Sequence, residues 1–365
     1  MRAESNVLRV LIAGGGTGGH LFPGIAVAQE LRRRTDAAVS FVGSDYGIEC
    51  HAVPAAGFDV DLLPVRGLRG RGPAEIARGI GRVASSLLGA RRVLRARRPD
   101  LVVGVGGYAS FPAVAAAAAS RIPIVLLEQN AAPGLATRVL APFASRVCVT
   151  FPATAAGLGR RAVVTGNPVR DFAATAGRAE AAAPDAYGRF RVLVFGGSGG
   201  AHRLNTVLPG ALARVGRPLA IEHQTGKTDR AAVEEAYRAK GLDAVVREFI
   251  DDMSSAYGRA DLVVCRAGAT TISELTALGK AAILVPFPFA AGDHQRLNGQ
   301  TLVDAGAAWM VLDRELDEDG LAVLLRRAID DPVATGELRR RARELGHPDA
   351  AARVADECLR VLGRA

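Results

Sequence analysis

The feature that most constrains the fold of this chain is a strand-and-glycine motif that occurs twice, 182 residues apart. Residues 9–15, Arg-Val-Leu-Ile-Ala-Gly-Gly, recur as residues 191–197, Arg-Val-Leu-Val-Phe-Gly-Gly. In each copy an apolar run of strand length enters a glycine-rich turn, as at the start of a Rossmann-like domain. The repeat therefore predicts two such domains within the 365 residues.

Other apolar runs of strand length alternate with amphipathic stretches along the whole chain. Continuous apolar strands separated by helices are typical of a parallel sheet covered on both faces, which predicts an α/β, doubly wound fold. We expect one domain over 1–165 and a second over 166–345, joined at Gly166-Asn167-Pro168. The expected strands are 7–13, 39–42, 59–63, 101–103, 124–127, 147–149, 191–195, 220–224, 244–247, 262–265, 282–285 and 308–311.

Composition excludes several classes of protein. An apolar content of 49% excludes a disordered chain. The four cysteines lie far apart without a histidine cluster, so we expect neither zinc nor disulfides and infer a reducing compartment. No run approaches the ~18 apolar residues that a membrane-spanning helix needs, and 7–13 leads into glycines rather than a cleavage site. We therefore expect a soluble or peripheral protein.

The net charge of +9 is concentrated in one segment. Residues 62–99 contain ten arginines and a single acid, Glu75, so the rest of the chain is formally neutral. We interpret the segment as a surface for anionic lipid rather than for nucleic acid, although 80–94 could equally be a core-packed helix with a basic outer face. The residues expected to contact the membrane are Leu62, Leu63, Val65, Arg66, Leu68, Arg69 and Arg71.

Three predicted strand-to-helix turns are rich in glycine: 14–19, 104–107 and 196–200. Such turns let main-chain N–H groups approach a phosphate at the positive end of a helix, although tight packing alone can also require glycine. The first turn matches a dinucleotide pattern, but the second strand ends at Ser44 and its acid, Asp45, comes late. No lysine follows any of the turns, which excludes a triphosphate P-loop.

A single glutamate and a pair of aspartates are candidates for a chemical role. Glu274 comes one turn into a predicted helix, where it could accept hydrogen bonds from a ribose diol or simply complement the helix dipole. Asp59 and Asp61 form an Asp-x-Asp pair within an alternating strand, and there we expect no metal.

A set of motifs runs in order between Val7 and the C-terminal helix: Gly14–His20 with Phe22-Pro23-Gly24, 104–110, Glu128-Gln129-Asn130, 166–170, 196–198, 249–253 and 265–274. Together these motifs closely resemble those of the MurG family of N-acetylglucosaminyltransferases. Two positions depart from the family pattern: Gly199 stands where glutamine is frequent, and Leu127 where histidine is common.

The resemblance implies a GT-B enzyme, with two Rossmann-like domains facing across a cleft and a C-terminal helix, about 346–365, packing back on the first. It implies inverting transfer of GlcNAc from UDP-GlcNAc to the C4 hydroxyl of undecaprenyl-pyrophosphoryl-MurNAc-pentapeptide, converting lipid I to lipid II, without a cofactor. The place of action would be the cytoplasmic face of the membrane, in peptidoglycan synthesis, cell shape and division. Cell-wall synthesis or division proteins would be possible partners.

The resemblance also assigns residues. His20 would be the base or an acceptor contact, and Phe249 would cap the uracil that the Ile250 backbone meets. Glu274 would hold the ribose, and Gln295, which is followed here by Arg296, would hold the GlcNAc. The UDP-GlcNAc set is completed by Thr17, Gly18, Gly19, Asn130, Arg170, Ser198, Ala269 and Thr270, and the acceptor pyrophosphate candidates are Gly15, Gly16, Gly106, Gly107 and Tyr108.

Three other functions stay open on the sequence. A UDP-GlcNAc 2-epimerase would share fold and donor, and a nucleotide-sugar sensor would bind without turnover. A nicotinamide dehydrogenase is disfavoured by the tip of the second strand. Product analysis with and without a lipid-linked acceptor separates these functions.

Overall fold

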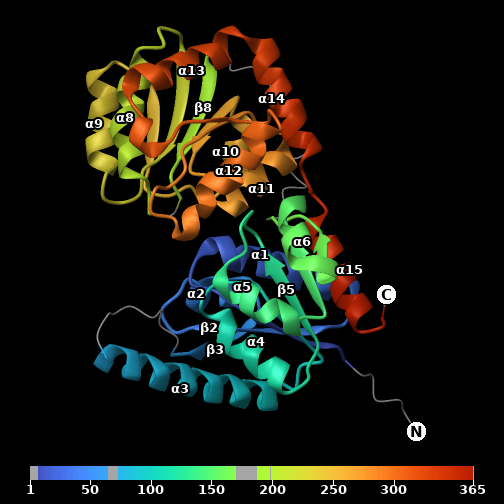
Figure 1. The fold of residues 1–365 in the computed structure, drawn as a ribbon. Coiled ribbons are helices and arrows are strands. Elements are labelled where there is room, and N and C mark those ends of the chain that lie inside the picture. The colour runs from blue at the N-terminus through green and yellow to red at the C-terminus, as the bar shows by residue number, and fades with distance from the viewer. Residues whose placement is uncertain (1–6, 65–72, 170–186, 198, 365) are drawn as a thin grey trace. The chain divides into compact units, whose positions relative to one another are not determined.

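The computed structural model describes residues 7–64, 73–169, 187–197 and 199–364, with backbone alone for 73–84. The chain divides into two compact units, Met1–Arg170 with His347–Ala365, and Asp171–Gly346. Each unit contains a parallel β-sheet with helices packed on it (Figure 1). The predicted α/β, doubly wound class is therefore confirmed.

The described part of the first unit contains a seven-stranded sheet in the order β3-β2-β1-β4-β5-β6-β7. Every pair of neighbouring strands is parallel, so all carboxyl ends lie at one edge of the sheet. The strands are β1 Arg9–Ala13, β2 Ala38–Ser44, β3 Asp59–Leu63, β4 Leu101–Gly104, β5 Ile124–Glu128, β6 Arg146–Val149 and β7 Ala162–Val164.

Helices cover both faces of this sheet, which explains why its strands are continuously apolar. Val10 and Ile12 of β1 belong to a core shared with α1 and α15, whereas Leu11 and Ala13 belong to a second core shared with α3 and α4. The helices of the unit are α1 Gly18–Arg34, α2 Glu49–Ala55, α3 Pro73–Arg97, α4 Ser110–Ala119, α5 Leu135–Leu140, α6 Pro152–Leu158 and α15 Ala350–Val361.

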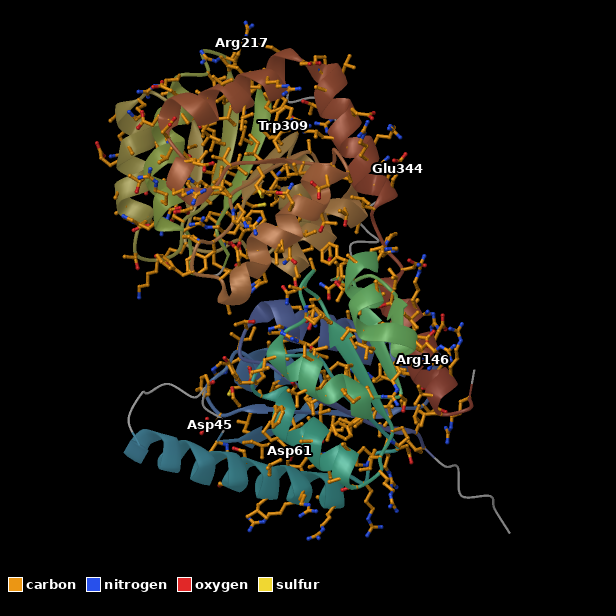
Figure 2. The ribbon with its side chains drawn as sticks, in the orientation of Figure 1. Asp45, Asp61, Arg146, Arg217, Trp309 and Glu344 are labelled. Carbon is orange, nitrogen blue, oxygen red and sulfur yellow. The ribbon has the colours of Figure 1, made fainter. Side chains whose placement is uncertain are left out.

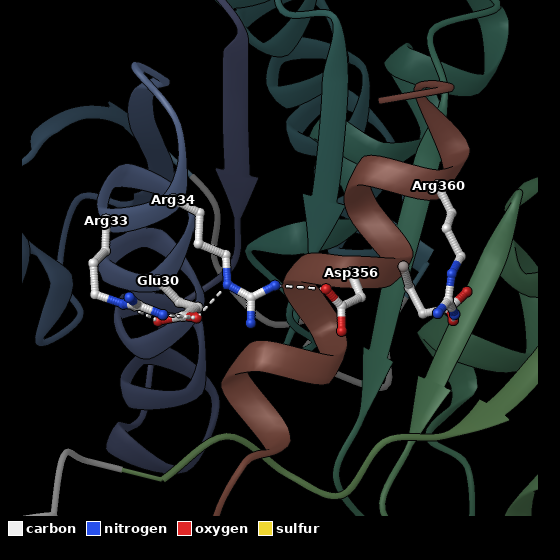
Figure 3. A network of polar contacts seen from close by, with 6 residues as sticks. Glu30, Arg33, Arg34, Asp356 and Arg360 are labelled. Atoms are coloured by element: carbon white, nitrogen blue, oxygen red, sulfur yellow. Dashed lines mark hydrogen bonds and ion pairs between the residues drawn. The ribbon is translucent and has the colours of Figure 1, made fainter. Parts of the chain in front are cut away.

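The C-terminal helix α15 is part of the first unit. Val354 and Cys358 are fully buried in the core beside α1 and β1. Arg34, in the last turn of α1, forms ion pairs with Glu30 of its own helix and with Asp356 of α15 (Figure 3). Apolar burial supplies most of the attachment, because ion pairs this exposed contribute little to stability.

The second unit repeats the arrangement with six described strands in the order β10-β9-β8-β11-β12-β13. Its opening strand, β8, occupies the place that β1 holds in the first sheet, in agreement with the sequence repeat. The strands are β8 Phe190–Phe195, β9 Leu219–Gln224, β10 Ala244–Arg247, β11 Leu262–Cys265, β12 Ala282–Leu284 and β13 Trp309–Met310. The helices are α8 His202–Ala213, α9 Arg230–Ala239, α10 Met253–Arg259, α11 Ala269–Leu278, α12 His294–Asp304, α13 Glu318–Asp330 and α14 Pro332–Glu344.

No helix within the described residues is long and apolar enough to cross a bilayer.

Candidate active site

The candidate residues of both units follow the carboxyl ends of parallel strands. In the first unit they come after β1, β4 and β5, and in the second after β8, β10, β11 and β12. Ligands of open α/β sheets bind beyond this edge. The topology therefore gathers positions that are far apart in sequence.

His20 lies in the first turn of α1 and has one ring nitrogen fixed by a neighbour. Its Nδ1 lies 3.2 Å from Oε1 of Gln129, whose Nε2 donates to the carbonyl of Val105 at 2.8 Å. An amide oxygen only accepts, so the network assigns the proton to Nδ1 and the lone pair of the neutral ring to Nε2. This is the tautomer that a general base acting through Nε2 requires.

The first two glycine turns pack against each other around this histidine. A Cβ on Gly107 would lie 2.8 Å from the carbonyl oxygen of Gly15 and 3.4 Å from Cδ2 of His20. Gly106 approaches Nδ1 of the same ring. Tyr108 follows with 73% of its surface exposed. The structure thus brings together Gly15, Gly106, Gly107 and His20, and leaves the Tyr108 ring mostly in solvent.

A buried carboxylate that no sequence motif indicates braces the first turn. Glu49 is fully buried, and its Oε2 accepts from the main-chain N–H of Gly16 at 2.8 Å. Its Oε1 accepts from the N–H and the hydroxyl of Ser44 at 2.7 and 2.6 Å. A Cβ on Gly15 or Gly47 would lie less than 3 Å from this carboxylate.

Glu49 changes two expectations. The N–H of Gly16 is already bound to it, so Gly16 is not available as a pyrophosphate donor through that group. Glu49 opens α2 beyond the end of β2, and its carboxylate is bound to Ser44 and Gly16, so it is not directed toward a ribose. The dinucleotide hypothesis for the first turn therefore loses its remaining support.

Asn130 lies in a loop held by the neighbouring buried acid, Glu128. Oε1 of Glu128 accepts from the main-chain and side-chain nitrogens of Asn130 at 3.0 and 3.2 Å, and Oε2 accepts from the N–H of Gly134 at 2.9 Å. Thr154 donates to the carbonyls of Asn130 and Ala131. The amide is thus pre-positioned directly after Gln129. Thr17, Gly18 and Gly19 form the partly or fully exposed start of α1.

In the second unit, the turn after β8 packs against the loop after β9. Gln224 is buried, and its Nε2 donates to the carbonyl of Gly197 at 2.8 Å. Gly200 approaches the carbonyl of Thr225 so closely that a Cβ there would lie 1.9 Å from it. The predicted diphosphate contacts Ser198 and Arg170 lie outside the described residues.

The predicted base-binding residues follow β10. Ile250 is buried, and its N–H donates to Oε1 of Gln224 at 2.8 Å. Phe249 beside it is 47% exposed, so the ring is accessible to a base. The Ile250 N–H therefore already has a partner within the protein.

Glu274 lies on α11, buried beside the tyrosine of α10. Its Oε2 accepts from the hydroxyl of Tyr257 at 3.0 Å, and the Tyr257 ring packs edge-on against Phe195. The same helix places Ala269 and Thr270 in its first turn, close to its positive end. The carboxylate is thus held by a phenol, in an orientation that the sequence did not reveal.

Gln295 lies in the first turn of α12, and its Oε1 accepts from the N–H of Phe287 at 2.9 Å. The two residues before Phe287 are held by Arg266, which donates to the carbonyls of Val285 and Pro286 and pairs with Asp313. With its oxygen so engaged, the amide nitrogen of Gln295 is the group oriented for a sugar hydroxyl.

A buried polar network links the end of β9 to side chains of α8 and α9. The ring of His223 contacts the hydroxyl of Tyr237 at 2.9 Å and Oδ1 of Asn205 at 3.1 Å. Asn205 in turn donates to the carbonyl of Thr225 at 2.9 Å. Burial lowers the pKa of His223 to about 3, so the ring is neutral at physiological pH.

The Asp-x-Asp pair forms ion pairs with an arginine. Arg97, near the end of α3, pairs with Asp59 at 2.9 Å and with Asp61 at 2.8 Å; Asp61 is labelled in Figure 2. No group of three or more potential metal-binding side chains occurs among the described residues.

One predicted membrane contact is wrong. Leu63 is buried in the core beside α3, because alternate residues of β3 point to opposite faces; Leu62 is 45% exposed. Five further predicted contacts lie outside the described residues: Val65, Arg66, Leu68, Arg69 and Arg71.

Comparison with known proteins places these features in a family. The family models for the glycosyltransferase family 28 N-terminal and C-terminal domains match residues 10–149 and 191–354. A protein from Anaeromyxobacter sp. (strain Fw109-5), named UDP-N-acetylglucosamine--N-acetylmuramyl-(pentapeptide) pyrophosphoryl-undecaprenol N-acetylglucosamine transferase, is 48% identical over 98% of this chain and 94% of its own length.

Comparison with solved structures supports the same family assignment. The crystal structure of Acinetobacter baumannii MurG superposes with a TM-score of 0.80 at 31% identity, covering 97% of this chain and 99% of that one. The UDP-GlcNAc 2-epimerase from Neisseria meningitidis shares the fold, with a TM-score of 0.70 at 13% identity over 97% of this chain and 100% of that one. The resemblance found in the motifs is confirmed: the chain belongs to the MurG family of glycosyltransferases.

Proposed function

We propose that this protein transfers GlcNAc from UDP-GlcNAc to the C4 hydroxyl of undecaprenyl-pyrophosphoryl-MurNAc-pentapeptide, converting lipid I to lipid II. The observation that carries the proposal is His20, held on a glycine turn with Nδ1 bound to Gln129. It supplies an oriented base in a chain whose close relatives bear the name of this transferase.

The base would act through Nε2 of His20. This nitrogen takes the proton of the acceptor C4 hydroxyl while the oxygen attacks the anomeric carbon. The bond from that carbon to the UDP oxygen breaks, so an α-linked donor gives a β-linked product. Asn130, the residue after Gln129, is braced by Glu128 and supports the reacting face.

The second unit would hold the donor. Phe249 caps the uracil, the buried Glu274 accepts from the ribose hydroxyls, and the amide nitrogen of Gln295 donates to GlcNAc. Charge that develops on the departing diphosphate is stabilised by the N-terminus of α11, with Arg170 and Ser198 as further contacts. These groups neutralise the leaving group without a metal ion or cofactor.

The epimerase alternative rests on fold alone, because the similarity is 13% in sequence. The decisive experiment supplies labelled UDP-GlcNAc with and without a lipid I analogue, in the presence and absence of EDTA. Transfer that requires the acceptor and persists in EDTA is the expected result. Acceptor-independent formation of a UDP-ManNAc product would replace the proposal with epimerisation, and intact UDP-GlcNAc would indicate a sensor.

The lipid-linked acceptor requires access to the membrane, and α3 offers a surface for it. Leu88, Arg91, Arg92 and Arg95 are all exposed and follow the i, i+3, i+4, i+7 spacing of one helix face. An exposed leucine among arginines suits a peripheral contact with anionic lipid on the cytoplasmic face.

Vesicle co-sedimentation tests this contact. At ~1 kcal/mol per basic residue, reversing Arg91, Arg92 and Arg95 to glutamate is expected to weaken binding to anionic vesicles roughly a hundredfold. Reversal of two exposed arginines of α9, Arg230 and Arg238, is the matched control and should leave most of the binding. Equal losses in both variants, or binding to neutral vesicles, would contradict a specific surface on α3. Reversal of Arg66, Arg69 and Arg71 tests the neighbouring segment in the same assay.

A further inference from the structure

Two segments of the second unit that are assigned to different parts of the donor are joined by one side chain. Gln224, the last residue of β9, donates through Nε2 to the carbonyl of Gly197 and accepts through Oε1 from the N–H of Ile250, both at 2.8 Å. Gly197 belongs to the turn assigned to the diphosphate, and Ile250 to the segment assigned to the uracil. The side chain is 3% exposed.

The two hydrogen bonds fix both the orientation and the position of the amide. Rotating the carboxamide by half a turn would face its NH₂ with an N–H and its oxygen with a carbonyl, losing both bonds. Its partners are main-chain groups, so the amide sets the spacing between the two segments themselves. Two main-chain hydrogen bonds lie next to this bridge: the N–H of Thr225 donates to the carbonyl of Arg247, and the N–H of Gly226 donates to the carbonyl of Glu248.

The bridge also limits which main-chain group of Ile250 can bind a base. The N–H of Ile250 is bound to Gln224, which leaves its carbonyl as an acceptor. Uracil presents an N3–H donor to such a carbonyl, whereas cytosine presents a lone pair at N3. Two acceptors facing each other are unfavourable, so this arrangement would select uracil over cytosine.

We propose that Gln224 is a positioning residue that sets uracil specificity and couples the base-binding segment to the diphosphate-binding turn. The inference rests on the proposed function, since it takes UDP-GlcNAc as the donor. Gln224 does not touch the reacting atoms, so its removal should change donor recognition and leave the chemical step intact.

Two variants separate the two bonds. Gln224→Leu removes both, whereas Gln224→Glu keeps an acceptor for Ile250 but has no donor for Gly197. Thr335→Val is the matched control, because Thr335 is equally buried in this unit and donates to the carbonyl of Ala328, away from both segments. Thermal unfolding and circular dichroism establish that each variant is folded.

For Gln224→Leu we expect KM for UDP-GlcNAc to rise about tenfold or more, with kcat at saturating donor and KM for the lipid I analogue within about threefold of the parent. Its preference for UDP over CDP, measured by calorimetry, should also fall. Gln224→Glu should bind UDP about tenfold more weakly and uridine almost as well as the parent. Thr335→Val should change none of these values.

An unchanged KM for UDP-GlcNAc in Gln224→Leu, or a loss confined to kcat, would overturn the inference. An equal KM rise in Thr335→Val would overturn it too, by showing that lost stability alone is responsible. If Gln224→Leu does not fold, the uridine and UDP affinities of Gln224→Glu test the inference instead. Equal weakening of both affinities would contradict the coupling between the base-binding segment and the diphosphate-binding turn. A parent protein that binds UDP but transfers no GlcNAc would refute the proposed function and leave the Gln224 binding test standing.

Discussion

The two copies of the strand-and-glycine motif differ in what braces them. The turn after β1 is held by the carboxylate of Glu49, which accepts from the N–H of Gly16. The turn after β8 is held by the neutral amide of Gln224, which donates to the carbonyl of Gly197. Glu49 is the first residue of α2, which follows β2, whereas Gln224 is the last residue of β9.

The difference shows how one local motif can serve two purposes. A buried negative charge consumes a main-chain donor and disfavours a phosphate beside it, whereas a neutral amide bound to a carbonyl takes no main-chain donor from the turn. We infer that the first turn positions His20 for chemistry and the second receives the diphosphate. The following predictions test this division.

The largest expected effect belongs to His20. His20→Ala should lower kcat by about 10² to 10⁴, the usual contribution of a general base, while UDP affinity stays within about twofold because the proposed function assigns UDP to the other unit. Steady-state kinetics and calorimetry measure the two quantities. His202→Ala, at an exposed histidine of α8, is the control. Near-normal turnover in His20→Ala would remove this residue from the chemistry.

Removing the charged brace should cost stability. Glu49→Leu leaves the N–H of Gly16 and both donors of Ser44 without their acceptor, so we expect the free energy of unfolding to fall by roughly 3 to 5 kcal/mol. Glu49→Gln retains some acceptor capacity and should lose less. Denaturant unfolding gives the values, and the half-exposed Glu234 of α9 serves as control through Glu234→Leu. A Glu49→Leu protein as stable as the parent would mean that the carboxylate does not hold the turn.

The smallest predicted effect is a pH dependence in the second unit. His223 has a pKa of about 3 in the folded state and about 6.5 when unfolded, so below pH 6.5 the unfolded chain binds the extra proton. The free energy of unfolding is therefore not reduced by this histidine above pH 6.5. It falls by about 1.4 kcal/mol per pH unit as the pH drops from 6.5 toward 3.

Urea unfolding at pH 7 and pH 5 measures this dependence. His223→Asn should remove about 2 kcal/mol of the stability difference between the two pH values, whereas His202→Asn should not. If both variants keep the parent's dependence, the ring of His223 is not the group that titrates.

Much of the fold could be predicted because apolar runs of strand length and glycine-rich turns are local features of the sequence. The twelve predicted strands correspond to strands of the structure, but β7 was missed, since it has three half-buried residues at the edge of the sheet and follows two arginines. Helix α1 begins at Gly18 and contains Pro23, a residue that in a sequence alone indicates a helix boundary.

In the candidate site, the sequence predicted the residues that belong to motifs but not the groups that orient them. His20, Glu274 and Gln295 follow from the family resemblance, but the groups that orient them come from other elements. Glu49 and Gln224 lie outside the motifs, and Gln129 lies within one that does not reveal its bond to His20. A brace is a tertiary contact, and no pattern along the chain encodes it directly.

The attachment of α15 has a consequence for biosynthesis. The first unit takes its sheet from the beginning of the chain and part of its core, including Val354 and Cys358, from the end. During translation this unit must wait with an uncovered apolar face until residues 347–365 leave the ribosome, whereas the second unit already has all of its residues. The domain that is synthesised first is therefore the one completed last, which inverts the usual N-to-C order of domain folding.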